Sequence, residues 1–429
     1  MIEIISDKVK IEEYFDILKK RANVNSSEFS NIVKDIIKNV ELKKDLAVEE
    51  YTKKFDDPNF SIKDIEISKD IQKKAFDSLD SNMKRVLLNA KERILSYHEH
   101  QKRTTFEYKD NIGASLGQRI TPLKRVGVYV PGGKAFYPSS ALMNILPAKV
   151  AGCKEVIMVT PAVKGYLNPL VLAAAYVCDV DRLFKIGGAQ AIAALALGTE
   201  SIPRVDKIVG PGNIFVALAK REVYGLCGID SIAGPSEIAI IADKTAKPRF
   251  LAADLLAQAE HDPMASSTLL ITDKNVANEV VKYVKEFYNL SNRQEILDSS
   301  LTKTSRIILV DNLDKAIELS NRIAPEHLEL ALDDARSILN KIENAGAIFI
   351  GHYSAEVFGD YMAGPNHVLP TCGTARFFSP LGVDDFIKKT SLIEFDYDSA
   401  SKILDDVDVF AKCENLGMHA LSASLRKEK

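Results

Sequence analysis

The stretch Arg125-Val-Gly-Val-Tyr-Val-Pro-Gly-Gly133 indicates the fold of this chain. Residues 126–130 have the composition of a buried strand, and the proline and glycines that follow end it in a turn. We expect a helix from about residue 138 to 151 and a second strand over residues 155–160. Because a strand, a helix and another strand in this order form a βαβ unit, the two strands should lie parallel in one sheet.

The same alternation of strands and helices continues toward the C-terminus. Asn168 and Pro169 have the residue types of a helix N-cap and of the first helical position. Further strands are expected within residues 182–188, 205–210, 238–241, 268–272, 306–310, 328–331 and 347–351. The two successive series predict an α/β fold with two similar domains, each built on a parallel sheet. Residues 1 to about 105 and the tail from residue 379 are predicted to be mostly helical.

Length and composition limit the class of protein. A chain of 429 residues allows two or three domains, and 46% hydrophobic with 27% charged residues is typical of a globular protein. The net charge of −3 and the pI near 6.2 argue against a nucleic-acid-binding surface, which normally has an excess of basic residues. There is no apolar run long enough to span a membrane and no signal-peptide pattern. We therefore expect a cytoplasmic protein without a nucleic-acid or membrane partner.

Five cysteines are scattered through the chain without a C-x-x-C pair, at Cys153, Cys178, Cys227, Cys372 and Cys413. Their number and spacing indicate neither a disulfide framework nor a cysteine zinc site. One of them could still be a catalytic nucleophile, so the cysteines distinguish two possible mechanisms.

Polar and glycine residues follow the expected strands in the middle of the chain. Tyr129, Gln190 and Asn213 lie there together with several glycines. Parallel sheets bind ligands at the carboxyl ends of their strands, and glycines there let the backbone approach a phosphate. However, the segment Gly210-Pro-Gly-Asn-Ile-Phe215 has phenylalanine where a dinucleotide fingerprint has its third glycine. A nucleotide-like ligand and ordinary turn glycines both fit this pattern.

A short helix is expected before Pro263, and it carries polar residues on one face. Gln258 and His261 lie at i and i+3, and Asp254 lies one turn earlier on the same side. Ligands at this spacing can hold a metal ion. A histidine near a helix C-terminus also interacts favourably with the helix dipole without binding a ligand, and glutamine is not a usual zinc ligand. The spacing alone leaves both interpretations open.

Acidic residues and histidines gather in later loops. Glu326 and His327 are neighbours before an expected strand, and Asp360 and His367 lie on turns rich in glycine and proline. A loop histidine is a candidate base or ligand, although it can also be simply solvated. Several of them beside carboxylates, on separate turns, favour a functional site.

Taken together, these motifs resemble those of the histidinol dehydrogenase family. The resemblance extends in order from about residue 120 to residue 419. It rests on Tyr-Val-Pro-Gly-Gly at 129–133, Gly-Gly-Ala-Gln at 187–190, Gly-Pro-Gly-Asn at 210–213, Ala-Gly-Pro-Ser-Glu at 233–237, Asp-Leu-Leu-Ala-Gln-Ala-Glu-His at 254–261, Pro-Glu-His-Leu at 325–328, Gly-Asp-Tyr at 359–361, Asn-His-Val-Leu-Pro-Thr at 366–371, and Glu414 and His419 in the tail.

The resemblance implies the last enzyme of histidine biosynthesis, which oxidises L-histidinol by four electrons, through L-histidinal, to L-histidine with two NAD and one zinc ion per subunit. It implies an aldehyde-dehydrogenase-like fold with two incomplete Rossmann-type domains. We expect an N-terminal extension at residues 1–25, a first α/β domain carrying most zinc and catalytic residues at 26–127 and 238–378, an NAD-binding domain at 128–237, and a helical dimerisation tail at 379–429.

The resemblance also implies roles for particular residues. Glu326 and His327 would be catalytic bases, with His367 as an auxiliary group. Expected zinc ligands are Gln258, His261, Asp360 and His419, expected NAD contacts are Tyr129, Gln190 and Asn213, and expected substrate contacts are Ser236, Gln258, His261, His327, Asp360, Glu414 and His419. In a homodimer, Glu414 and His419 would complete the neighbouring subunit's site.

Three rival functions are compatible with parts of the sequence. A thiol-dependent aldehyde dehydrogenase would require a cysteine nucleophile, whereas Cys153 and Cys372 are packing residues in the implied mechanism. A zinc-dependent hydrolase would need the metal and not NAD. The third rival is a ligand-binding α/β protein without catalytic activity.

Overall fold

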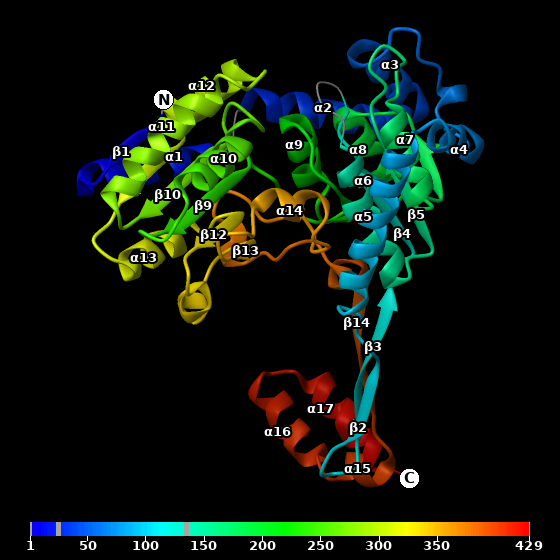
Figure 1. Cartoon of the computed structure of the whole chain (residues 1–429). Coiled ribbons are helices and arrows are strands. Elements are labelled where there is room, and N and C mark those ends of the chain that lie inside the picture. Colours follow the sequence, from blue (N-terminus) through cyan, green and yellow to red (C-terminus); the bar gives the residue numbers. More distant parts are fainter. Residues whose placement is uncertain (1, 23–26, 133–136, 429) are drawn as a thin grey trace.

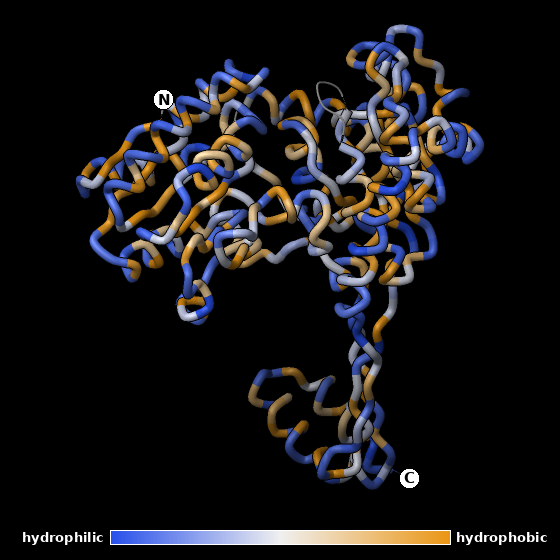
Figure 2. Tube along the Cα trace, viewed as in Figure 1, coloured by the Kyte–Doolittle hydropathy of each residue, from blue (hydrophilic) through white to orange (hydrophobic). Residues whose placement is uncertain are grey.

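The computed structural model describes residues 2–22, 27–132 and 137–428, so Gly133 of the quoted stretch and residues 23–25 of the expected extension lie outside it. The chain forms a body of two α/β units and a tail that stands away from the body (Figure 1). Hydrophobic segments run through the body and also along the tail helices (Figure 2). Within the described ranges, no helix is both long and apolar enough to cross a membrane. The cytoplasmic location stays a prediction.

The first unit is built on a six-stranded parallel sheet with strand order β1-β11-β10-β9-β12-β13. Its strands are β1 (Glu3–Ile5), β9 (Glu237–Ala242), β10 (Ser266–Ile271), β11 (Arg306–Leu309), β12 (His327–Ala331) and β13 (Ala347–Ile350). The four strands β9 to β12 are almost entirely buried, as expected for a sheet that is covered on both faces.

Helices cover both faces of this first sheet. One face packs against α10 (Pro248–Ala259), α11 (Lys274–Tyr288) and α12 (Gln294–Lys303). The other packs against α1 (Lys8–Ala22), α13 (Leu313–Ile323) and the 3₁₀ segment η2 (Ala335–Lys341). The short helix α14 (Glu356–Tyr361) follows β13, and η3 (Thr374–Arg376) lies in the loop beyond it.

The second unit is built on a five-stranded parallel sheet with strand order β6-β5-β4-β7-β8. Its strands are β4 (Arg125–Tyr129), β5 (Glu155–Val159), β6 (Arg182–Phe184), β7 (Lys207–Val209) and β8 (Gly228–Ile229). Its helices are α2 (Ser27–Lys43), α3 (Asp45–Phe55), α4 (Lys69–Asp77), α5 (Ser81–Glu99), α6 (Pro138–Ala151), α7 (Pro169–Val177), α8 (Gly188–Leu197) and α9 (Ile214–Val223), with η1 (Ile62–Asp64) and η4 (Val383–Phe386). As expected, Asn168 caps α7 by accepting a hydrogen bond from the Leu170 N–H at 2.8 Å.

A three-stranded antiparallel ribbon connects the body to the tail. It pairs β3 (Ser115–Pro122) with both β2 (Phe106–Lys109) and β14 (Ile387–Glu394). The tail helices are α15 (Tyr397–Ser401), α16 (Leu404–Cys413) and α17 (Gly417–Ser424), followed by η5 (Leu425–Lys427). The ribbon therefore holds α16 and α17 at a distance from the body (Figure 1).

The α/β fold with two parallel sheets is confirmed, but the packing differs from the predicted domain division. The helix α1, expected in a separate extension, packs in the core of the first sheet. Residues 27–99, expected to belong with residues 238–378, instead cover the second sheet, where Val33, Ile36 and Val40 join its core. The tail is not purely helical, because β14 is an eight-residue strand. An amphipathic sequence shows that a helix has an apolar face and not which sheet that face will cover.

Gly210 provides a test of how closely the strand ends pack in the second sheet. Its φ is +111°, and a Cβ atom there would lie 2.1 Å from the Tyr129 carbonyl oxygen. Gly225 has a similar φ of +103° with nothing within 4 Å of a Cβ, so it is a matched control. We expect Gly225→Ala to lower the free energy of unfolding by about 1–3 kcal/mol through backbone strain. Gly210→Ala should cost roughly 1–3 kcal/mol more through overpacking. Denaturant titration measures both, and equal losses would contradict the close approach.

Candidate active site

The predicted bases lie at the amino-terminal edge of the first sheet. Glu326 directly precedes β12, and His327 is the first residue of that strand, opposite Ile238 of β9. Both side chains are buried, with 6% and 5% of their residues' surface exposed. The predicted NAD contacts, in contrast, follow the carboxyl ends of strands in the second sheet.

The backbone of Glu237 holds both of these side chains. Its N–H donates to Glu326 Oε2 at 2.9 Å, and its carbonyl oxygen lies 3.2 Å from His327 Nδ1. Because a carbonyl oxygen only accepts hydrogen bonds, Nδ1 of His327 must carry the proton. The lone pair of neutral His327 is then on Nε2, which lies 3.9 Å from Glu356 Oε1.

Burial moves the pKa values of these two groups in opposite directions. Burial lowers the pKa of His327 to about 3, so the imidazole is neutral at pH values near neutrality. Burial raises the pKa of Glu326 well above its usual value, against the opposing effect of the Glu237 N–H. Burial therefore keeps His327 in the neutral form, whose free nitrogen can accept a proton, and increases the affinity of the Glu326 carboxylate for a proton.

A second group of polar side chains comes from the end of α10, the turn after it and α14. His261, Glu356 and Asp360 each offer a ligand atom, and these atoms lie within 4.8 Å of one another. His261 Nε2 is 3.9 Å from Asp360 Oδ2. Gln258 is in the last turn of α10, but that helix ends at Ala259, so His261 lies in the turn after it and not on the helix as expected.

Several atoms of this group lack a partner. Among the described residues, both amide atoms of Gln258 and both carboxylate oxygens of Glu356 are buried without a hydrogen bond. Buried polar atoms of this kind cost free energy unless a ligand satisfies them. Nitrogen and oxygen donors in such a cluster fit Zn²⁺, so the residues present are compatible with the expected metal.

The charges of this group are also unbalanced without a cation. Burial raises the pKa of Asp360 to about 6. Burial also raises the pKa of Glu356, and the negative charge of the neighbouring Asp360 raises it further. Burial lowers the pKa of His261. A divalent cation would favour the deprotonated carboxylates and the neutral imidazole.

The loop after α14 connects this group to the second unit. His367 Nδ1 lies 3.1 Å from the Asp360 carbonyl oxygen and 3.8 Å from its Oδ1, and burial lowers the His367 pKa to about 4. Arg93 of α5 donates to the Met362 carbonyl, and Asn366 donates to the Met143 carbonyl of α6 at 2.7 Å. The position of Asp360 and His367 therefore depends on both units of the body.

The three predicted NAD contacts lie at the carboxyl ends of strands of the second sheet. Tyr129 ends β4, and its hydroxyl accepts a hydrogen bond from the Gly188 N–H at 3.2 Å. Gln190 is buried in α8 and donates to Asp56 Oδ2 at 3.4 Å. Asn213 is exposed and caps α9 by accepting from Phe215 and Val216. Their contact with NAD stays a prediction, and Asn213 has a structural role in any case.

Three predicted substrate or metal contacts remain, Ser236, Glu414 and His419. Ser236 lies in the turn before β9, next to Glu237. Glu414 and His419 are exposed in the tail, which stands apart from the body, so one chain does not bring them to the other residues (Figure 1).

Sequence reasoning missed Glu356 and Glu237. Glu356 had a detectable signal, because it precedes Asp360 by four residues and therefore shares its helix face. Glu237 acts through its backbone, and the sequence carries no signal for that role.

Comparisons with known proteins all point to one family. The sequence profile of the family described as histidinol dehydrogenase matches residues 19–427. The histidinol dehydrogenase of Clostridium acetobutylicum is 48% identical over 428 residues, covering 99% of both chains. That of Dechloromonas aromatica is 52% identical over 394 residues, covering 92% of this chain and 91% of its own. A crystal structure of histidinol dehydrogenase from Elizabethkingia anophelis superposes with a TM-score of 0.92 at 34% identity, covering 99% of this chain and 98% of that one.

The pKa of Asp360 predicts a pH-dependent effect of zinc on stability. The folded pKa of about 6 is above the ordinary aspartate value of 3.8, so without metal this carboxyl group destabilises the fold as pH rises from about 4 to 6. Zinc binds the deprotonated group and offsets that loss. We expect the zinc-induced rise in Tm to be larger at pH 8 than at pH 5, measured by calorimetry with and without the metal. In Asp360→Asn the difference between the two pH values should shrink, and a rise independent of pH in the parent would contradict the assignment.

Proposed function

The chain belongs to the histidinol dehydrogenase family, and on that premise we propose how its residues divide the work of the reaction. Members of this family are NAD-dependent oxidoreductases that perform the last step of histidine biosynthesis. We propose that this chain converts L-histidinol through L-histidinal to L-histidine, with two NAD and one zinc ion per subunit.

The metal-binding residues would be Gln258, His261 and Asp360, with His419 of the partner subunit as the fourth ligand. When bound there, zinc would hold the amine and imidazole of histidinol and orient its carbinol carbon. The unpartnered amide of Gln258 supports its place in this set, although glutamine is an uncommon ligand. Glu356 lies close enough to His261 and Asp360 to serve as a further ligand or as a contact for the amine.

His327 would act as the base in the oxidation of the alcohol. Its Nε2 would accept the hydroxyl proton while hydride leaves the carbinol carbon for the nicotinamide. Glu326 would then take a proton from the water that attacks the aldehyde. The resulting hydrate would give its hydride to the second NAD and release a hydroxyl proton, which leaves the carboxylic acid. His367 would position these groups or relay protons. The observation that carries the proposal is that His327 presents Nε2, not Nδ1, toward Glu356, which lies beside His261 and Asp360.

The cysteines give little support to the thiol-dependent alternative. Burial raises the pKa of Cys372 to about 12, that of Cys178 to about 12, and those of Cys153 and Cys227 to about 11. A cysteine nucleophile reacts as the thiolate, so thiols of this kind are poorly suited to the role.

Substitution of the proposed base tests the reaction directly. We expect His327→Asn to lower kcat for NADH formation from histidinol by about 10²–10⁴-fold, since general-base catalysis is lost. Chelation of the metal should abolish turnover, and added zinc should restore it. Cys153→Ala and Cys372→Ala should each retain most of the parent's kcat. Loss of activity in one cysteine variant, with His327→Asn still active, would favour the thiol mechanism.

We also propose that the active site is completed by a second subunit. Glu414 and His419 lie outside the body's site, on a tail whose Val409, Phe410 and Met418 side chains are 60%, 72% and 75% exposed. The body has a cavity of 1250 Å³ lined by residues of β13, α14 and the 377–385 segment. Exposed apolar side chains on one part and a large cavity beside α14 on another would both be covered in a homodimer.

Complementation between two inactive variants tests this shared site. A heterodimer of Glu326→Gln and His419→Asn subunits should have one intact site and one doubly altered site, and therefore about half of the parent's activity. Each variant alone should be nearly inactive. The two subunits would carry different affinity tags, so that the purified heterodimer itself is assayed for NADH formation. An inactive heterodimer would refute the exchange of tails.

A further inference from the structure

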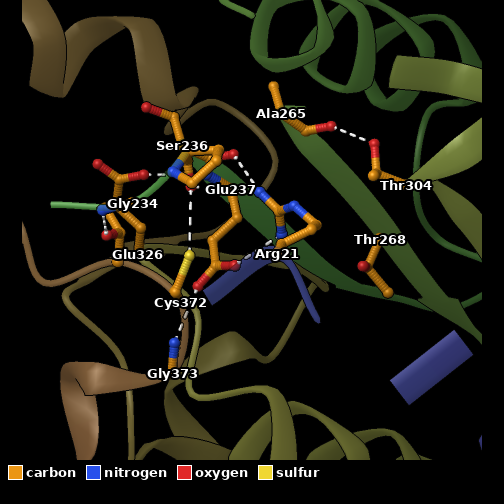
Figure 3. A network of polar contacts seen from close by, with 12 residues as sticks. Arg21, Gly234, Ser236, Glu237, Ala265, Thr268, Thr304, Glu326, Cys372 and Gly373 are labelled. Carbon is orange, nitrogen blue, oxygen red and sulfur yellow. Dashed lines mark hydrogen bonds and ion pairs between the residues drawn. The ribbon is translucent and has the colours of Figure 1, made fainter. Parts of the chain in front are cut away.

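Arg21 of α1 makes a set of buried contacts with the turn that precedes β9 (Figure 3). Its Nη1 lies 3.1 Å from Glu237 Oε2, and both side chains are nearly inaccessible, at 1% and 3% exposure. Its Nη2 donates to the carbonyl oxygens of Pro235, at 3.2 Å, and Ser236, at 3.1 Å. Its Nε donates to the Met264 carbonyl at 2.7 Å. One guanidinium therefore fixes the turn at three points and a neighbouring loop at a fourth.

The same turn holds the proposed bases. The Glu237 N–H orients Glu326, and the Glu237 carbonyl oxygen fixes the proton on His327 Nδ1. A displaced turn would lengthen both contacts at once. The chain therefore connects Arg21 to Glu326 and His327 through a single peptide segment.

We propose that Arg21 is a positioning residue for catalysis, which holds Glu326 and His327 in their working geometry through the 235–237 turn. The inference rests on the roles proposed above for these two bases. A planar guanidinium can serve a carboxylate and three carbonyl oxygens in fixed directions, whereas the ammonium of lysine cannot reach the same set. Arg21→Lys should therefore keep a charge beside Glu237 but lose the alignment of the turn.

A purely structural role is the alternative, because Arg21 also anchors α1 to the first unit. The chain offers a matched control for that role. Arg322 of α13 also anchors α1, through two hydrogen bonds to Glu12 at 2.9 and 2.8 Å. This pair is substantially exposed and does not contact the 235–237 turn. Arg322→Met therefore removes an anchor of α1 without touching the turn.

The experiment compares Arg21→Lys, Arg21→Met and Arg322→Met in the full-length, zinc-loaded enzyme. Zinc content, Tm, kcat and KM for histidinol are measured for each, and kcat is expressed per folded molecule. We expect Arg21→Lys to bind zinc like the parent, to change KM by less than about threefold and to lower kcat by about tenfold or more, as displaced catalytic groups do. Arg322→Met should keep the parent's kcat even if its Tm falls.

Two results would overturn the proposal. One is a parental kcat in Arg21→Lys, and the other is an equal loss of kcat in Arg322→Met. If Arg21→Met does not fold, Arg21→Lys decides. Glu326→Gln and His327→Asn are measured alongside. If these two variants retain activity, Glu326 and His327 are not the catalytic bases, and Arg21 has no catalytic group to position. If they are inactive while Arg21→Lys is fully active, only the role of Arg21 is refuted.

Discussion

The candidate active site depends on two hydrogen bonds made by the backbone of Glu237. They orient a carboxylate and an imidazole that are adjacent in sequence and buried at the start of β12. Because β9 and β12 are neighbouring parallel strands, the first peptide of one strand lies beside the first side chains of the other. The register of a sheet thus sets the tautomer of His327, and with it the nitrogen that can accept a proton.

Burial is the second constraint. Glu326, Glu356 and Gln258 are buried, so the polar atoms of each side chain destabilise the fold unless a hydrogen bond or a ligand satisfies them. The unpartnered atoms of Gln258 and Glu356 favour a role in ligand binding over a role in stabilising the fold. The unfavourable free energy of these unpartnered atoms is offset by apolar burial elsewhere, in two sheets that are covered with apolar helices on both faces.

The site also draws on parts of the molecule that are remote in sequence. The helix α1 reaches it through Arg21, and α5 and α6 reach it through the loop that carries His367. The tail, in contrast, is held away from it by the β3–β14 ribbon. The geometry of the candidate site therefore depends on the packing between the two units. The tail is available to contact another subunit.

The sequence by itself determined the alternation of strands and helices, because periodicity, caps such as Asn168 and turn glycines are local signals. It also singled out His327 and the Gln258/His261 spacing, since unusual residue types stand out within apolar or turn segments. Only the tertiary structure decided that residues 27–99 cover the second sheet and that Glu356 joins His261 and Asp360. Helix packing partners and backbone contacts depend on which surfaces meet in the folded chain, and no local pattern of side chains encodes that choice.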